Sequence, residues 1–573
     1  MNAMHSITDH GALDTALQEL DEAKHDWARI SIKERLAILS EIKDALLPVA
    51  EDWAKIASRA KQLPEGSPLE GEEWISGPYA LMSACNGLSQ TFAEMEGKAF
   101  LSHVPRRQLP NGQLALKVMP HSIWDRFLLS GVSADIWMQP GVTDDNLASH
   151  AAVAYDIPPE QRQGKVALIL GAGNIASIAP LDVFHKLFNE NQVCILKMNP
   201  VNDYLTPFLK TALAPLIRRN ALRIVSGDGA TGAYLTEHPL VEEMHITGSQ
   251  ATHDAIVWGT GEEGRRNRAS GTPRNNRRFT SELGAVCPTI VVPGPWSAAD
   301  IRFQAEHIVT QKLHNSGFNC IACQVIITKR GWELGPALFE AAKAVVARSA
   351  RPAYYPGAVD RMEIYMAKSS ERVKLPRGDA PALIVTETGH SDYFREAEVF
   401  APAMSRTRLD ASDPEDFLRR AVAYANDQLH GTLGANILIH PKTLRSIGRT
   451  RFTEIIAELR YGTIAVNAWT GLGFLLPPCP WGAFPGHSLQ DVQSGIGTVH
   501  NCLMLEKTER TVVEAPFRPF PRNLLSGGRT LLPRPPWFIT NRRQDRLGKL
   551  LVDFQHRPGW SKLPKIFMNA LRG

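Results

Sequence analysis

Two cysteines three residues apart, Cys320 and Cys323, are the first candidates for chemistry in this sequence. A Cys-x-x-Cys pair can form a redox dithiol or supply half of a zinc site. No second pair of this kind completes a zinc site, so no metal is predicted. The commonest fate of a single cysteine is burial as a small apolar side chain. The pair alone leaves a reactive thiol, a redox pair and simple packing open.

A glycine-rich stretch, Gly171-Ala-Gly-Asn-Ile-Ala176, follows an apolar run at 166–170. A G-x-G sequence after a strand begins the dinucleotide fingerprint, whose glycines let the backbone approach a pyrophosphate. The third glycine of that fingerprint is missing here. Cofactor contact and an ordinary turn therefore both remain possible for this stretch.

The elements around these residues alternate between short apolar runs and helical stretches. The runs in the first half are at 166–170, 193–197, 222–225 and 244–246, and those in the second half are at 289–292, 325–328, 383–385 and 434–439. Such alternation predicts doubly wound parallel sheets, which bind ligands at the carboxyl ends of their strands. Residues 11 to 62 have helical periodicity and predict a packing layer of two or three amphipathic helices.

Composition fits a protein that works in a reducing compartment. The hydrophobic share of 44%, the charged share of 21% and the net charge of +4 are ordinary, and nucleic acid is not expected as a partner. Seven scattered cysteines do not form a disulfide framework. No secretory signal and no apolar run of spanning length is visible. A cytoplasmic location is therefore predicted.

The order of several short motifs narrows the alternatives. They are Asn174, Lys197, Gly227-Asp-Gly229, Ile246-Thr-Gly-Ser249, Ser281-Glu-Leu-Gly284, Gly317-Phe-Asn-Cys320, Glu398-Val-Phe-Ala-Pro402 and Gly462-Thr-Ile-Ala-Val-Asn467. In this order they resemble the aldehyde dehydrogenase superfamily, from about residue 27 to about residue 500. The resemblance implies an α/β, aldehyde dehydrogenase-like fold, with two doubly wound Rossmann-type domains and a small oligomerisation β-flap.

The resemblance also implies domain limits. We expect N-terminal helices and an NAD(P)-binding domain at 1–281, with a flap element near 140–160, and a catalytic domain at 282–465. A return segment is expected at 466–505 and a basic, aromatic C-terminal extension at 506–573.

The resemblance assigns three catalytic residues. Cys320 matches the family's nucleophile, whose thiolate attacks an aldehyde and forms a thiohemiacetal. The side-chain amide of Asn174 and the backbone N–H of Cys320 would stabilise the oxyanion. Glu282 matches the general base that activates water to hydrolyse the thioester, and burial would raise its pKa toward neutrality.

The cofactor residues follow from the same resemblance. Lys197 would bind the adenosine ribose, and Ser249, at a helix start, would meet the pyrophosphate. Glu398 would hold the nicotinamide ribose and Phe400 would flank the nicotinamide, although Phe400 could equally be a core residue. The remaining residues matched to cofactor binding are Gly229, Thr247, Gly248, Leu283 and Gly284.

Three departures limit the resemblance. Phe318 stands where the family usually has glutamine, and Ala285 stands where it usually has glycine, so the added methyl could crowd the nicotinamide. Pro200 stands where NAD-specific members often have an acidic residue, so NAD and NADP both remain possible. The arginine-rich stretch 259–280 is interpreted as a solvated loop or insertion, with a place near the adenosine as the alternative.

The expected reaction is NAD(P)-dependent oxidation of an aldehyde to a carboxylic acid. Transfer of the acyl group to or from coenzyme A is the alternative, and a non-catalytic role is a third. The apolar stretch 469–481 matches the family's substrate funnel and suggests a hydrophobic aldehyde, although it could fill core. Cys323 could form a protective disulfide or simply pack.

The tail at 516–573 exceeds the usual family length and carries 12 Lys and Arg against Asp545 and Asp553. Packing within or between subunits is the first expectation for it. A contact with an anionic membrane surface and a cover over the active-site mouth are the alternatives. A homodimer or homotetramer is implied by the resemblance alone.

Overall fold

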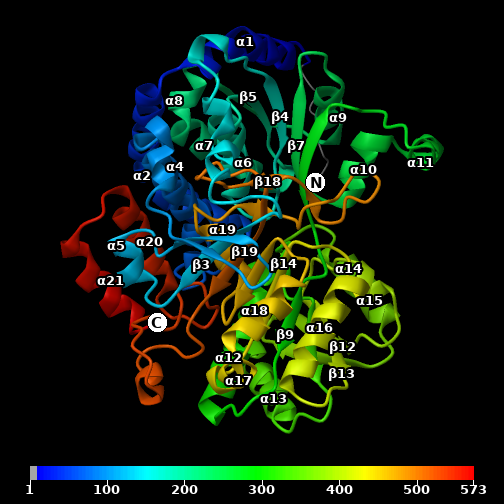
Figure 1. The fold of residues 1–573 in the computed structure, drawn as a ribbon. Coiled ribbons are helices and arrows are strands. Elements are labelled where there is room, and N and C mark those ends of the chain that lie inside the picture. The colour runs from blue at the N-terminus through cyan, green and yellow to red at the C-terminus, as the bar shows by residue number, and fades with distance from the viewer. Residues whose placement is uncertain (1–9) are drawn as a thin grey trace.

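The computed structural model describes residues 10–573. It contains two large sheets and a small two-stranded one, each large sheet flanked by helices (Figure 1). This α/β architecture agrees with the fold predicted from the sequence. Among the described residues, no helix combines the length and the apolar character needed to cross a membrane.

The first large sheet has six strands in the order β17-β8-β7-β4-β5-β6. All its pairs are parallel except that between β17 and β8. Its strands are β4 (Val166–Leu170), β5 (Val193–Lys197), β6 (Leu222–Val225), β7 (Glu243–Gly248), β8 (Arg278–Leu283) and β17 (Gly495–Ile496). The four apolar runs predicted in this half all form strands. Strands β4 and β5 are buried along their whole length, as expected for a sheet covered on both faces.

The second sheet has eleven strands in the order β1-β2-β3-β19-β15-β14-β9-β10-β13-β12-β11. Its middle is parallel and carries β9 (Pro288–Val291), β10 (Val325–Lys329), β13 (Ala403–Leu409), β14 (Gly434–Leu438) and β15 (Thr463–Val466). Strands β11 (Arg372–Arg377) and β12 (Ala380–Glu387) end one side. The predicted runs of this half are confirmed as β9, β10, β12 and β14.

The other side of this sheet is antiparallel and joins distant parts of the chain. Strand β19 (Thr508–Glu514) pairs in parallel with β15 and antiparallel with β3 (Ser133–Met138). Strands β2 (Leu114–Met119) and β1 (Arg106–Gln108) follow. Residues 140–160, where a flap element is predicted, hold short 3-10 turns and one isolated bridge, Ala151 to Leu505. The domain limits and the oligomerisation role stay predictions.

The predicted N-terminal helices form a layer over the first sheet (Figure 1). They are α1 (His10–Arg29) and α2 (Ile32–Ala60), which are followed by α3 (Glu70–Trp74) and α4 (Ala80–Ala93). Ser31 separates the first two, because its hydroxyl accepts from the Glu34 N–H while the Glu34 carboxylate accepts from the Ser31 N–H. This reciprocal pair is a capping box, which fixes the start of α2.

Two segments differ from the simplest interpretation. Within 259–280, the structure has a helix, α11 (Gly261–Ser270), so the expectation of a loop was wrong for these residues. Figure 1 shows α11 projecting at the edge of the molecule. The tail packs on its own chain: α20 (Gln544–His556) lies against α3, and a Cβ on Gly548 would approach Trp74 Cβ to 2.4 Å. A glycine is needed there because the two helices touch.

Candidate active site

A cleft of about 1040 Å³ lies at the carboxyl ends of the first sheet and reaches the second. Every residue to which the sequence assigns a role lines it. They are Asn174, Lys197, Gly229, Thr247, Gly248, Ser249, Glu282, Leu283, Gly284, Cys320, Glu398 and Phe400. Residues separated by more than two hundred positions in the sequence therefore meet around one cavity.

The thiol of Cys320 lies beside the carboxyl group of Glu282, the penultimate residue of β8. Cys320 Sγ donates a hydrogen bond to Glu282 Oε1 at 3.0 Å. Burial raises the pKa of Glu282 to about 7, although the contact with Cys320 acts in the opposite direction. Burial and the neighbouring Glu282 carboxylate raise the pKa of Cys320 well above its usual value. The thiol proton thus has an acceptor that titrates near neutrality.

Asn174 lines the same cleft as Cys320, and its side-chain amide is already partly engaged. Its Nδ2 donates to the carbonyl of Phe318 at 2.9 Å. A primary amide carries two N–H donors, so one remains for a further acceptor. Asn174 and Cys320 both line the cleft and a second cavity next to it.

The nucleophile follows a turn with an unusual backbone. Asn315, Ser316 and Gly317 all have positive φ, at 51°, 55° and 88°. Two consecutive non-glycine residues in this region cost free energy, on the order of 1–3 kcal/mol each, unless their surroundings hold them. Asn315 supplies that support. Its N–H donates to Glu72 Oε2 at 2.9 Å, and its Nδ2 donates to the Asn174 and Phe318 carbonyls, both at 3.1 Å.

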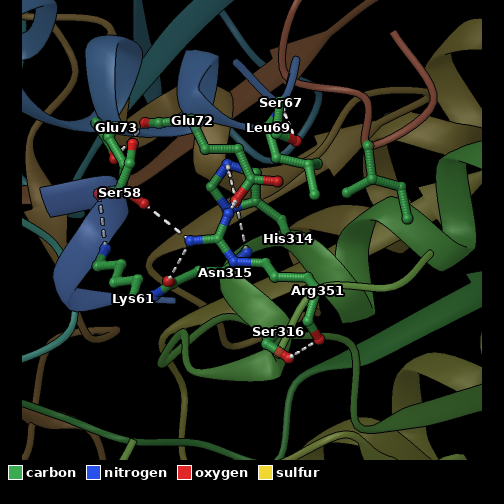
Figure 2. A network of polar contacts seen from close by, with 12 residues as sticks. Ser58, Lys61, Ser67, Leu69, Glu72, Glu73, His314, Asn315, Ser316 and Arg351 are labelled. Atoms are coloured by element: carbon green, nitrogen blue, oxygen red, sulfur yellow. Dashed lines mark hydrogen bonds and ion pairs between the residues drawn. The ribbon is translucent and has the colours of Figure 1, made fainter. Parts of the chain in front are cut away.

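A buried network of charges surrounds Asn315 (Figure 2). Arg351 forms ion pairs with Glu72 at 2.5 Å and with Glu73 at 2.8 Å. Lys61 pairs with Glu73 at 2.9 Å and also donates to the Asn174 carbonyl at 2.9 Å. Burial by itself would raise the pKa of Glu73, but Lys61 and Arg351 bring it below its ordinary value.

This network connects helices α2 and α3 with both the Asn174 turn and the nucleophile turn. Sequence reasoning missed its members. Lys61 caps the end of α2 and Glu72 lies in α3, and the usual interpretation of such charged residues is a solvated face. The one available signal was Glu72-Glu73 directly before Trp74 and a largely uncharged stretch.

Glu398 is the second buried acid of the cleft. Burial raises its pKa to about 8, and its Oε1 has no hydrogen-bond partner among the described residues. A Cβ on Gly284 would fall 1.9 Å from Glu398 Oε2, so only glycine fits beside this carboxyl group. An unpartnered buried oxygen that lines a large cleft points to a polar ligand group.

The structure shows where the two residues that depart from the family pattern near the cleft, Phe318 and Ala285, are packed. Phe318 is buried and packs against Tyr354, Tyr355 and Phe400, with ring centroids 5.2, 5.4 and 5.7 Å away. Ala285 is buried in the core and does not line the cleft. The crowding suggested for its methyl group therefore has no counterpart in the cleft wall. Cys323 is a free, fully buried thiol, and burial raises its pKa to about 11.

The outer part of the cleft is built from helix starts. Gly229 opens α9 (Gly229–Glu237) and Ser249 caps α10 (Gln250–Trp258), where its hydroxyl accepts from the Thr252 N–H at 3.2 Å. Lys197 ends β5. Burial lowers its pKa, while Asp228 and Asp203 act in the opposite direction.

Several cleft residues were missed from the sequence. Asp228, Tyr355, Arg361, Arg274 and Arg277 all line the cleft. Arg274 and Arg277 belong to the stretch 259–280. The structure therefore places these two residues next to the cleft, which was the alternative to a solvated loop. Asp228 could have been found as the middle residue of Gly227-Asp-Gly229.

A second, narrow cavity of about 50 Å³ shares Asn174, Ile178, Glu282 and Cys320 with the cleft. Aromatic and aliphatic side chains form most of its wall. They include Ile75, Ile175, Ile321, Trp469, Phe474, Leu475, Trp481 and Trp537. The stretch 469–481, matched to a substrate funnel, contributes four of them. Cys320 thus faces a wide polar cleft on one side and a narrow apolar cavity on the other.

Comparisons with known proteins agree with this arrangement. A model of the aldehyde dehydrogenase family matches residues 193–475. An aldehyde dehydrogenase of Enchytraeus buchholzi is 30% identical over 135 residues, which are 22% of this chain and 24% of that protein. Aldehyde dehydrogenase LUC3 of Fusarium sp is 24% identical over 176 residues, 30% of this chain and 35% of that protein. The matched segments span about a quarter to a third of these relatives' length.

Solved structures extend the likeness in fold to most of the chain. The NAD-dependent aldehyde dehydrogenase from Sinorhizobium meliloti has a TM-score of 0.56 and 18% identity, over 89% of this chain and 88% of that one. An AldC mutant from Pseudomonas syringae, in complex with NAD+ and octanal, has a TM-score of 0.56 and 16% identity, over 89% of this chain and 90% of that one. The NADP-dependent glyceraldehyde-3-phosphate dehydrogenase from Bacillus halodurans C-125, complexed with NADP, has a TM-score of 0.57 and 18% identity, over 88% of this chain and 91% of that one. The order of the residues along the cleft, the match of the family model to residues 193–475 and the shared fold agree, so this chain is similar to the aldehyde dehydrogenases in the matched segment and in fold.

Proposed function

We propose that this protein oxidises an aldehyde to a carboxylic acid, with NAD or NADP as the electron acceptor. One observation carries the proposal: the Cys320 thiol is hydrogen-bonded to Glu282 at the point where the wide cleft meets the apolar cavity. A nucleophile and its base are in contact, and a space lies on each side of them. One space suits a dinucleotide and the other suits the carbon chain of a substrate.

The chain's own groups account for the chemical steps. Glu282 takes the thiol proton, and Cys320 Sγ bonds to the aldehyde carbon to give a thiohemiacetal. The free N–H of the Asn174 amide and the Cys320 backbone N–H are the donors proposed for its oxyanion. Hydride leaves this carbon, and a thioester remains. Glu282, having released its first proton, then deprotonates the water that attacks the thioester, so that the acid departs and the thiol is restored.

The cleft residues fit a dinucleotide. When bound, NAD or NADP would supply the electron acceptor for the hydride. Phosphate groups are favoured at the starts of α9 and α10, where backbone N–H groups are free and the helix dipole is positive. Lys197 would bind ribose hydroxyls, and the unpartnered Glu398 Oε1 would accept from a second ribose. Phe400 would flank the nicotinamide, which the wall position of Phe400 supports over a core role.

Asp228 bears on the choice between NAD and NADP. The absence of an acid at position 200 left both cofactors open. Asp228 nevertheless lines the cleft and interacts electrostatically with Lys197. A carboxylate near a ribose-binding lysine disfavours a 2′-phosphate, so we propose NAD as the preferred cofactor. Arg274 and Arg277, which also line the cleft, are the groups that would favour NADP.

Transfer of the acyl group to coenzyme A is the alternative reaction. It uses the same thiol but needs no base to activate water. Glu282 is in contact with Cys320, and its pKa is raised to about 7. A base with this pKa supports hydrolysis as the second half-reaction. The apolar wall of the second cavity supports a hydrophobic aldehyde.

The surface of the extension, the family resemblance and the cysteines bear on the setting of the enzyme. Exposed Trp560, Met568 and Leu571, together with the basic composition of the tail, support contact with an anionic membrane surface. Failure of the protein to bind anionic vesicles at low salt would remove that idea. A homodimer or homotetramer rests on the family resemblance, and a cytoplasmic location rests on seven free cysteines.

The deciding experiment measures reduction of NAD and of NADP by a panel of aldehydes, with and without coenzyme A. Wild-type protein is compared with Cys320→Ala. We expect aldehyde-dependent reduction that needs no coenzyme A and disappears in the variant. A product that forms only with coenzyme A would overturn the assignment to hydrolysis, and full activity of Cys320→Ala would overturn the nucleophile.

A further inference from the structure

The C-terminal extension is fastened along one helix of the catalytic region. That helix is α12 (Ala298–Leu313), and the part of the extension that contacts it is the segment 517–540. At its start, Asp300 pairs with Arg518 and Arg522, both at 2.6 Å. In its middle, Gln304 Nε2 donates to the Phe517 carbonyl at 2.8 Å.

Further contacts continue toward the end of α12. Glu306 pairs with Arg534 at 3.1 Å and accepts from the Thr540 hydroxyl at 3.2 Å. The Ile539 N–H donates to the Thr310 hydroxyl at 3.3 Å. Successive turns of α12 are therefore bonded to the extension.

Aromatic packing fixes Phe538, which lies between these contacts along the extension. Phe538 is 1% exposed and stacks on Phe303 and His307, with centroids 5.4 and 5.2 Å apart. Its neighbour Trp537 is 6% exposed and lines the narrow cavity together with Cys320. The extension thus contributes a large, rigid side chain to the wall of the apolar cavity.

The same helix leads to two parts of this cavity's lining. The turn His314–Gly317, which precedes Cys320, follows directly on α12. Contacts of α12 with Phe538 and Ile539 hold the neighbouring Trp537 in the cavity wall. Both the nucleophile turn and the segment that carries the indole are therefore tied to one helix, and the buried indole forms a fixed part of the wall.

We propose that Trp537 is a specificity-determining residue. It restricts the proposed aldehyde dehydrogenase to slender apolar aldehydes, either straight-chain or with one ring, and it excludes bicyclic and heavily branched ones. The inference rests on the proposed function for its substrate, and on the cavity of about 50 Å³ for its size limit. The cavity is narrow and the buried indole forms part of its wall, so a second fused ring would have to overlap the indole, whereas a single chain or ring would not.

The test uses full-length protein and the variants Trp537→Phe and Trp537→Ala. The control is Trp560→Ala, which removes an exposed tryptophan of the same extension that does not line the cavity. The readout is kcat/KM for naphthaldehyde relative to hexanal. We expect this ratio to rise at least tenfold in Trp537→Ala, to rise less in Trp537→Phe and to stay unchanged in the control. An unchanged ratio in folded Trp537→Ala would overturn the proposal.

A second measurement does not need turnover. The rate at which Cys320 is alkylated by N-hexyl and by N-naphthyl iodoacetamide is followed by mass spectrometry of the peptide. We expect the ratio of the naphthyl rate to the hexyl rate to be at least tenfold higher in Trp537→Ala than in the wild type. If no aldehyde is oxidised but the alkylation ratio changes, the proposed function is wrong and the role of Trp537 as a size limit is supported. If aldehydes are oxidised and neither ratio changes, only the role of Trp537 is wrong. Trp537→Phe, which keeps an aromatic ring, covers the case in which Trp537→Ala does not fold.

Discussion

The carboxyl group of Glu282 accepts the hydrogen bond of the Cys320 thiol at 3.0 Å, in a place where both groups are buried. Burial disfavours the charged form of each, and a shared proton reduces that cost. The pair behaves as one unit whose acid member has a pKa of about 7. The reaction needs Glu282 in its ionised form, because only that form accepts a proton.

The first prediction concerns the dependence of kcat on pH. In the wild type, kcat should rise as the pH passes through about 7, and in Glu282→Gln this rise should be absent. Below pH 7 the carboxyl group is protonated and cannot serve as a base. The variant should retain its fold and lose a factor of about 10² to 10⁴ in kcat, the usual contribution of a general base. The measurement is a pH–rate profile of both proteins. A profile of unchanged shape in Glu282→Gln would assign the base elsewhere.

Arg351 carries the second prediction. Its guanidinium group neutralises two buried carboxylates, Glu72 and Glu73. Arg351→Met should destabilise the protein by about 3–5 kcal/mol, because it leaves buried charge uncompensated. Urea unfolding measures the free energy of unfolding. Arg330→Met is the matched control, since Arg330 forms an exposed pair with Asp410 and should cost less than about 1 kcal/mol. Equal losses in the two variants would contradict the role given to the buried network.

Two glycines of the cleft give the third prediction. A Cβ on Gly284 would overlap Glu398 Oε2 at 1.9 Å, whereas a Cβ on Gly229 has nothing within 4 Å. Gly284→Ala should therefore displace the Glu398 carboxyl group and raise KM for the cofactor at least tenfold. Gly229→Ala should leave the free energy of unfolding unchanged within about 0.5 kcal/mol. Steady-state kinetics and urea unfolding test both. Ordinary cofactor binding by Gly284→Ala would show that Glu398 does not hold the ribose.

Asp228 provides the fourth prediction. Its carboxylate caps α9 and lies near Lys197. Asn can accept the same capping bonds without the charge, so Asp228→Asn should keep the helix and admit a 2′-phosphate more readily. We expect the ratio of kcat/KM for NADP to that for NAD to rise about tenfold.

The control for that variant is Asp413→Asn. Asp413 caps α16 (Pro414–Gln428) in the same manner and lies outside the residues that line the cleft. A shift of the cofactor ratio in this control, or none in Asp228→Asn, would refute electrostatic selection by Asp228.

Local sequence explains which parts of the fold were predictable. The apolar runs of β4 and β5 are complete buried strands, because both faces of the sheet are covered and every position except Lys197 is apolar or small. Cys320, Glu282 and Asn174 were found because their order along the chain carries a recognisable pattern. Asn174 follows β4 and Glu282 lies near the end of β8 in one sheet, and Cys320 reaches the same cleft from the segment before β10 of the other sheet.

Other features depend on contacts between distant segments, which a single sequence does not reveal. Lys61 and Glu72 looked like solvent-facing charges until α2 and α3 were placed against Arg351. Trp537 was one of several aromatic residues in a tail with no family counterpart. Its place beside Cys320 depends on the bonds between α12 and the tail. Helix α11 was missed because its polar sequence has no apolar face to predict it.

Strand β19 has a consequence for how the protein is made. It lies between β3 and β15, yet it leaves the ribosome after every other strand of its sheet. Until residues 508–514 emerge, both neighbours keep open edges, and such edges can pair with other chains. Closing this sheet joins segments almost four hundred residues apart, which is intrinsically slow. While β19 is still missing, the unpaired edges of β3 and β15 therefore expose this sheet to pairing with other chains.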